Sequence, residues 1–94
     1  MSKFVYTNTG FRMEFSNGLT ASVQWGKGTF STNRFAYDAT ESKTAEVAVM
    51  SCNGFQNANM FVPADCCNGD DDVVGYLTPD EVIEFLMNVK NFEF

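Results

Sequence analysis

Residues 11–25 read FRMEFSNGLTASVQW, and this stretch decides the fold because apolar and polar residues alternate in it on both sides of a turn. The apolar positions are Phe11, Met13 and Phe15 before the turn, and Leu19, Ala21, Val23 and Trp25 after it. A period of two residues is typical of a strand that places one face on a core. The stretch therefore predicts a β-hairpin.

The length of the turn follows from the pairing that keeps the apolar residues on one face. A two-residue loop pairs Phe15 with Thr20 and puts the two apolar sets on opposite faces of the sheet. A three-residue loop, residues 16–18, pairs Phe15 with Leu19 and keeps the sets together. It also places Gly18 at the bulge position, where a left-handed backbone costs least without a Cβ. We therefore predict the three-residue loop.

Further strand signals lie on both sides of this hairpin. Residues 4–6 predict a short strand in the same sheet, and the alternation in residues 44–50 predicts a central strand. Residues 59–62 predict another strand, and residues 73–76 predict a short extended segment. Residues 29–43 are polar with aromatic residues between them, and they fit either a long loop or one weak strand with a turn.

The end of the chain predicts one helix, which runs to about Lys90. Thr78 fits the N-cap, Pro79 fits the first helical position, and Glu81 completes a capping box with Thr78. Together with the strands, this helix predicts one α+β domain over residues 1–94. We expect an antiparallel sheet of four to six strands with the C-terminal α-helix packed on one face.

The apolar arc of this helix is broader than one sheet usually covers. It consists of Val82, Phe85, Leu86 and Val89, widened on one side by Ile83 and Met87. The excess fits either burial of both helix flanks or a contact in a homo-oligomer, and of the two we expect burial.

Composition excludes several classes of function. The chain of 94 residues has no His, which excludes Ser-His and Cys-His nucleophiles and the usual zinc and iron sites. Cys52, Cys66 and Cys67 are odd in number, and the adjacent pair could close only a strained ring, so we expect no disulfide framework. They also lack the spacing of metal ligands, so we expect no metal or cofactor. The net charge of −6 disfavours binding to duplex nucleic acid. Without a secretory signal or an apolar run of about 20 residues, we expect a cytoplasmic protein with no membrane partner. The side chains form no recognisable catalytic set, so we expect no catalytic site.

The charges are divided between the two halves of the chain. Residues 1–43 carry five basic and three acidic residues, a net charge of +2, whereas residues 44–94 carry one basic and nine acidic residues, a net charge of −8. Such asymmetry indicates an interaction surface. The acidic patch that we expect to bind a partner consists of Asp65, Asp70, Asp71, Asp72 and Asp80. It would attract a surface rich in Lys and Arg.

Part of this acidic patch also resembles a calcium loop. Counted from Asp70 as the first position, residues 70–81 fit an EF-hand at several positions. Val74, however, supplies no carboxylate at the fifth position, and Glu81 is needed for the capping box. We therefore expect a solvated acidic loop.

A second candidate site lies in the basic half of the chain. Glycines beside a cation suit the backbone cradle of an anion, and aromatic side chains beside a guanidinium suit stacking on a nucleotide. The residues of this nucleotide site are Trp25, Lys27, Gly28, Arg34 and Tyr37. The structural alternative is a glycine turn at a strand end, followed by core aromatics that flank a surface Arg.

Three segments, residues 11–26, 44–49 and 71–82, resemble a group of small uncharacterised accessory proteins carried by tailed bacteriophages. The resemblance implies a phage protein that acts in the cytoplasm of an infected bacterial host, and it assigns no functional residue. We therefore expect a non-enzymatic inhibitor that binds a bacterial defence or host protein. The alternatives are an oligomeric sponge that sequesters a nucleotide immune signal, and a minor structural or assembly protein of the virion.

Overall fold

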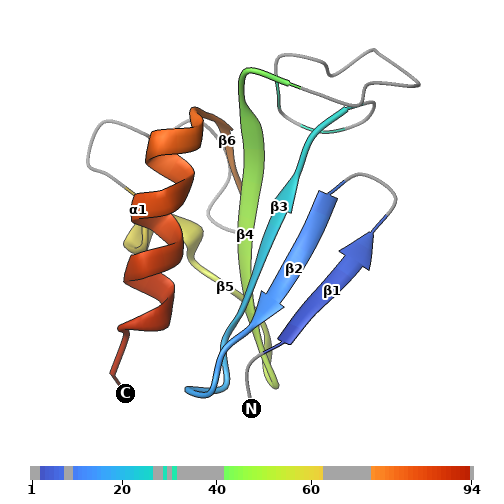
Figure 1. Ribbon diagram of the computed structural model, residues 1–94. Coiled ribbons are helices and arrows are strands. Elements are labelled where there is room, and N and C mark those ends of the chain that lie inside the picture. The colour runs from blue at the N-terminus through green and yellow to red at the C-terminus, as the bar shows by residue number, and fades with distance from the viewer. Residues whose placement is uncertain are drawn as a thin grey trace.

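A six-stranded antiparallel sheet and one C-terminal helix form an α+β fold (Figure 1) in the computed structural model, which describes residues 3–7, 10–26, 29, 31, 42–62 and 73–93. The elements are β1 (Lys3–Thr7), β2 (Gly10–Glu14), β3 (Thr20–Gln24), β4 (Ala45–Ser51), β5 (Gly54–Gln56), a short 3-10 helix η1 (Ala58–Met60), β6 (Val73–Leu77) and α1 (Pro79–Lys90). The strand order is β1-β2-β3-β4-β5, and β6 also pairs with β4. The predicted fold class is confirmed.

The hairpin of β2 and β3 has the predicted register. Met13 lies opposite Ala21, and Phe11 lies opposite Val23. The N–H group of Phe15 donates to the carbonyl oxygen of Leu19 at 2.9 Å, which closes the three-residue loop. Gly18 has a φ of +91°, so the loop uses the left-handed conformation that a missing Cβ permits.

Strand β4 is the centre of the sheet, as its alternation predicts. It pairs with β3 along one edge and with β5 and β6 along the other. Val47 and Val49 point to the same face and are fully buried. The short strands predicted near residues 4–6 and 73–76 are confirmed as β1 and β6.

The strand predicted over residues 59–62 is wrong. Residues Ala58–Met60 form η1, and the N–H group of Phe61 donates to the carbonyl oxygen of Ala58 at 3.0 Å. A 3-10 turn has three residues per turn, so Ala58 and Phe61 fall on one side and both are buried, while Met60 is exposed. Burial with a period of three replaces the alternation that a strand would need.

Helix α1 starts as predicted. Thr78 Oγ1 accepts a hydrogen bond from the N–H group of Glu81 at 3.3 Å, and Glu81 Oε1 accepts one from the N–H group of Thr78 at 2.8 Å. These reciprocal bonds satisfy two N–H groups at the helix start. The capping box is confirmed.

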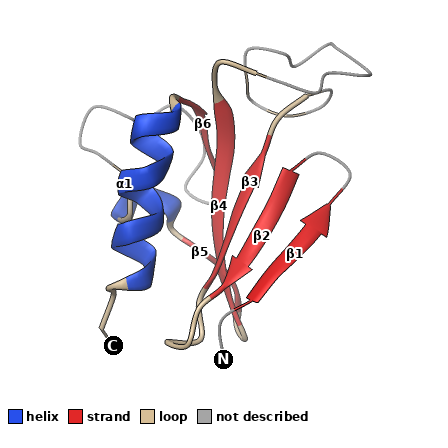
Figure 2. Cartoon of the chain, viewed as in Figure 1, coloured by secondary structure: helices blue, strands red, loops and turns tan. Residues whose placement is uncertain are grey.

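One side of α1 covers the sheet over β3, β4 and β6 (Figure 2). Phe85 and Val89 are fully buried there, and Val82 is nearly so. The expected burial of both helix flanks is wrong, because Ile83 is 62% exposed and Met87 is 50% exposed. The sheet lies against only one side of α1 and leaves both side chains largely accessible, with Ile83 at the rim of a cavity between α1 and the sheet.

Candidate binding surfaces

The structure describes one residue from each of the two predicted sites. Trp25 is half-buried directly after β3 and packs against the core. Asp80 is exposed in the first turn of α1. The remaining members of the two sets lie outside the described residues: Lys27, Gly28, Arg34 and Tyr37 of the nucleotide site, and Asp65, Asp70, Asp71 and Asp72 of the acidic patch.

The backbone after Trp25 is organised by buried hydroxyl groups. The N–H group of Gly26 donates to Ser31 Oγ at 3.2 Å, and Thr29 Oγ1 donates to the carbonyl oxygen of Gly26 at 2.7 Å. The hydroxyl groups of Thr29 and Ser31 lie 2.8 Å apart. The N–H group of Gly26 is therefore engaged within the chain, which fits the structural alternative of a glycine turn at a strand end.

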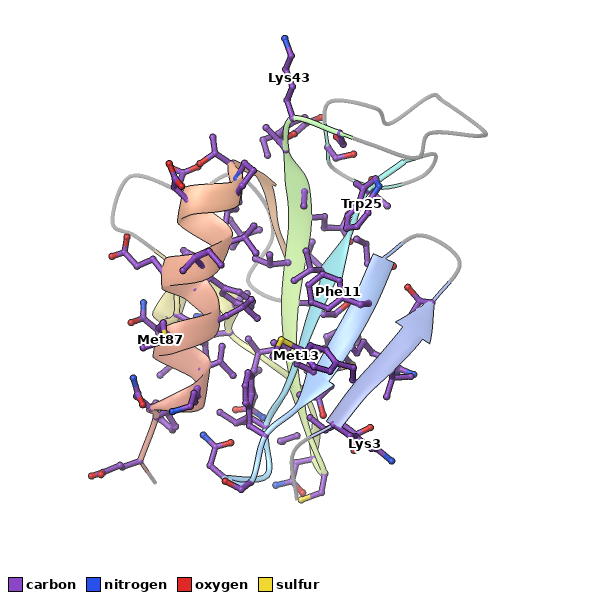
Figure 3. All side chains as sticks on the ribbon, in the orientation of Figure 1. Lys3, Phe11, Met13, Trp25, Lys43 and Met87 are labelled. Atoms are coloured by element: carbon purple, nitrogen blue, oxygen red, sulfur yellow. The ribbon has the colours of Figure 1, made fainter. Side chains whose placement is uncertain are left out.

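An apolar cavity of about 360 Å³ lies beside Trp25, between α1 and the sheet. Its walls include Phe11, Trp25, Leu77 and Leu86, and residues 42–44 also line it. Figure 3 shows the side chain of Lys43 extending away from the fold. The volume is within the range of small-molecule sites. The walls offer contact to an apolar group but few hydrogen-bond donors to a phosphate.

The exposed face of α1 combines apolar and acidic side chains. Asp80, Ile83, Glu84 and Met87 are all exposed, and their spacing of three and four residues places them on one helical stripe. Met87 is labelled in Figure 3, on the same helix. We name these four residues the α1 stripe. The sequence marks Ile83 and Met87 as excess apolar residues, but only the packing shows that they remain largely exposed.

Away from α1, an exposed ion pair lies at the edge of the sheet. On the strands at the edge of the sheet, Lys3 Nζ lies 3.8 Å from Glu14 Oε1, and both side chains are well exposed. Exposed pairs of this kind contribute little to stability. Cys52 is a free, exposed thiol.

Two further findings concern the residues that the structure describes. No three acidic or cysteine side chains among them are grouped so that they could hold a metal ion. None of their helices has the length and apolar character that a bilayer span requires. Comparison with protein-family models, with curated proteins and with solved structures gives no match for this chain.

Proposed function

We propose that this protein is a non-enzymatic phage accessory protein that binds and inhibits a bacterial defence or host protein. The observation that carries the binding role is the α1 stripe, where Ile83 and Met87 are exposed beside Asp80 and Glu84. The resemblance of residues 11–26, 44–49 and 71–82 to phage accessory proteins supports the bacterial context.

The chemistry of the α1 stripe defines the partner. Protein interfaces have an apolar centre that excludes water and a polar rim. Ile83 and Met87 supply the centre, and the carboxylates of Asp80 and Glu84 supply a negative rim. The complementary surface presents apolar side chains with Lys or Arg beside them. The net charge of −8 over residues 44–94 would speed the approach of such a surface.

The test is affinity purification from infected bacteria with a variant of the α1 stripe and a control variant outside it. The double variant Ile83→Ser/Met87→Ser removes the apolar centre of the stripe. Phe55→Ser is the control, because Phe55 of β5 is another exposed apolar residue, at 57%, outside the stripe. Wild type and the control should retain a stoichiometric protein partner that the double variant loses, with circular dichroism unchanged. Equal recovery of the partner with all three proteins would contradict the proposal.

The charged rim has a separate test on the purified partner. Asp80→Asn and Glu84→Gln should slow association and make it less sensitive to salt, because rim charges act mainly on the association rate. Glu46→Gln, a change on β4 outside the stripe, serves as the control. Association rates that stay equal in all variants at low salt would remove the electrostatic part of the proposal.

The second candidate is the oligomeric nucleotide sponge. The observation in its favour is the half-buried Trp25 beside the apolar cavity of about 360 Å³, since an indole face can stack on a base. A cyclic dinucleotide would then raise the melting temperature of the wild type and not that of Trp25→Leu. The third candidate, a minor virion protein, is tested by mass spectrometry of purified particles.

A further inference from the structure

A second cavity, of about 300 Å³, opens on the opposite face of the sheet and is lined by Arg12 of β2. Strand alternation places Arg12 there, because its neighbours Phe11 and Met13 pack against the core under α1 (Figure 3). Ser22, directly opposite Arg12 on β3, lines the same cavity. This site is therefore separate from the α1 stripe and from the cavity beside Trp25.

Arg12 has a buried donor with no acceptor. Among the buried side-chain nitrogen and oxygen atoms of the described chain, Arg12 Nε is the one that lacks a hydrogen-bond partner. A guanidinium remains charged at all physiological pH values and directs its N–H groups in a fixed planar fork. Buried donors are almost always paired, so an unpaired Nε–H group at a cavity indicates an acceptor supplied from outside the chain.

The neighbouring polar side chains are held in other bonds. Thr7 Oγ1 donates to Gln24 Oε1 at 2.9 Å, and Gln24 Nε2 donates to Ser22 Oγ at 3.0 Å. These bonds join β1 to β3 across the wall of the cavity and turn the Gln24 amide oxygen toward Thr7. The wall is thus fixed before a ligand arrives, which reduces the ordering that binding would require.

The geometry points to a small carboxylate with an apolar body as the ligand of Arg12. The Nε–H edge of a guanidinium can donate two parallel hydrogen bonds to the two oxygens of a carboxylate. Glu46 lines the same cavity, and its charge disfavours a dianionic phosphate more than a monoanion. Met50 and Phe55 line the cavity as well, and Phe55 is largely exposed, so they offer apolar contact to the rest of the ligand.

Nuclear magnetic resonance of the unmodified protein tests this assignment with phenylacetate as the probe. Saturating phenylacetate should shift the Arg12 Nε–H signal, whereas 2-phenylethanol, a neutral probe of similar shape, should leave it in place. Phenyl phosphate, a dianion above neutral pH, should bind more weakly than phenylacetate. An Arg12 signal that phenylacetate leaves unchanged at millimolar concentration would overturn the proposal, as would tighter binding of phenyl phosphate.

One variant separates the geometry of the Arg12 side chain from its charge, and a second serves as the control. Arg12→Lys keeps the positive charge and removes the planar fork, and we expect it to weaken phenylacetate binding by about tenfold or more. Lys43→Gln removes a cation that lines the other cavity, and it should leave the affinity unchanged. Full affinity in Arg12→Lys would show that the fork has no part in binding and would count against the site.

Discussion

Asn17 in the hairpin turn shows how much a single side chain contributes to this fold. Its Oδ1 accepts a hydrogen bond from the N–H group of Leu19 at 3.0 Å, within the turn. Its Nδ2 donates to the carbonyl oxygens of Val89, Lys90 and Phe92 at 2.8, 3.3 and 3.2 Å. The last carbonyl groups of a helix have no donor within the helix. Asn17 therefore closes the turn and caps the end of α1.

Replacement of Asn17 tests this double role. Asn17→Ala loses both contacts and should lower the free energy of unfolding by about 1–2 kcal/mol. Asn17→Asp should cost more, because a carboxylate at this place faces carbonyl oxygens and the negative end of the helix dipole. Urea unfolding measures both effects. Asn53→Asp in the exposed turn between β4 and β5 is the control and should have little effect.

The penalty in Asn17→Asp should depend on pH with a definite sign. The carbonyl groups raise the pKa of the new carboxyl group in the folded state above its unfolded value. The destabilisation by the charge is therefore full above the folded pKa, fades as the pH falls through the folded pKa, and is gone below the unfolded pKa, where the group is protonated in both states. Unfolding curves at pH 7 and pH 3 that give the same difference from wild type would contradict this account.

At the scale of one element, the start of α1 depends on a few residues that are neighbours in the sequence. Removal of the hydroxyl group in Thr78→Ala should lower the free energy of unfolding by about 1 kcal/mol, the usual effect of losing an N-cap. Thr78→Ser retains the acceptor oxygen and should stay close to wild type. Equal losses in the two variants, measured by urea unfolding, would show that the Thr78 methyl group matters rather than the cap.

The path of residues 58–62 shows where reasoning about one element is insufficient. Its apolar residues resemble a strand in sequence, yet Asn88 Nδ2 of α1 donates to the carbonyl oxygen of Phe61 at 2.8 Å. The rings of Phe61 and Phe92 meet edge to face, with centroids 5.3 Å apart. Phe61 is therefore held against α1 and the residues after it, while η1 lies against β4 and β6, and no pattern within residues 58–62 indicates these neighbours.

At the scale of the whole molecule, Phe85 is the largest of the buried side chains that join α1 to the sheet. It is fully buried within the core cluster, and its truncation leaves a cavity between two layers. Phe85→Ala should lower the free energy of unfolding by about 3–5 kcal/mol. Domains of this size have a free energy of unfolding of about 5–15 kcal/mol. The Phe85→Ala protein should therefore reach its unfolding midpoint at a low urea concentration.

The matched control for Phe85 is Phe55→Ala. Phe55 is 57% exposed, so the same chemical change there should alter the midpoint of urea unfolding only slightly. Circular dichroism followed through both transitions compares the two changes directly. A Phe85→Ala protein as stable as the Phe55→Ala protein would mean that α1 contributes little to the fold.

By itself, the sequence determined the features whose causes lie within a few residues of one another. Alternation and the conformational freedom of Gly18 specified the hairpin register, and Thr78, Pro79 and Glu81 specified the start of α1. Only the tertiary structure decided the cap from Asn17, the exposure of Ile83 and Met87, and the unpaired Nε of Arg12. Each of these features depends on which segments distant in the sequence pack against the residue. Burial and pairing are set by that packing and not by the local sequence.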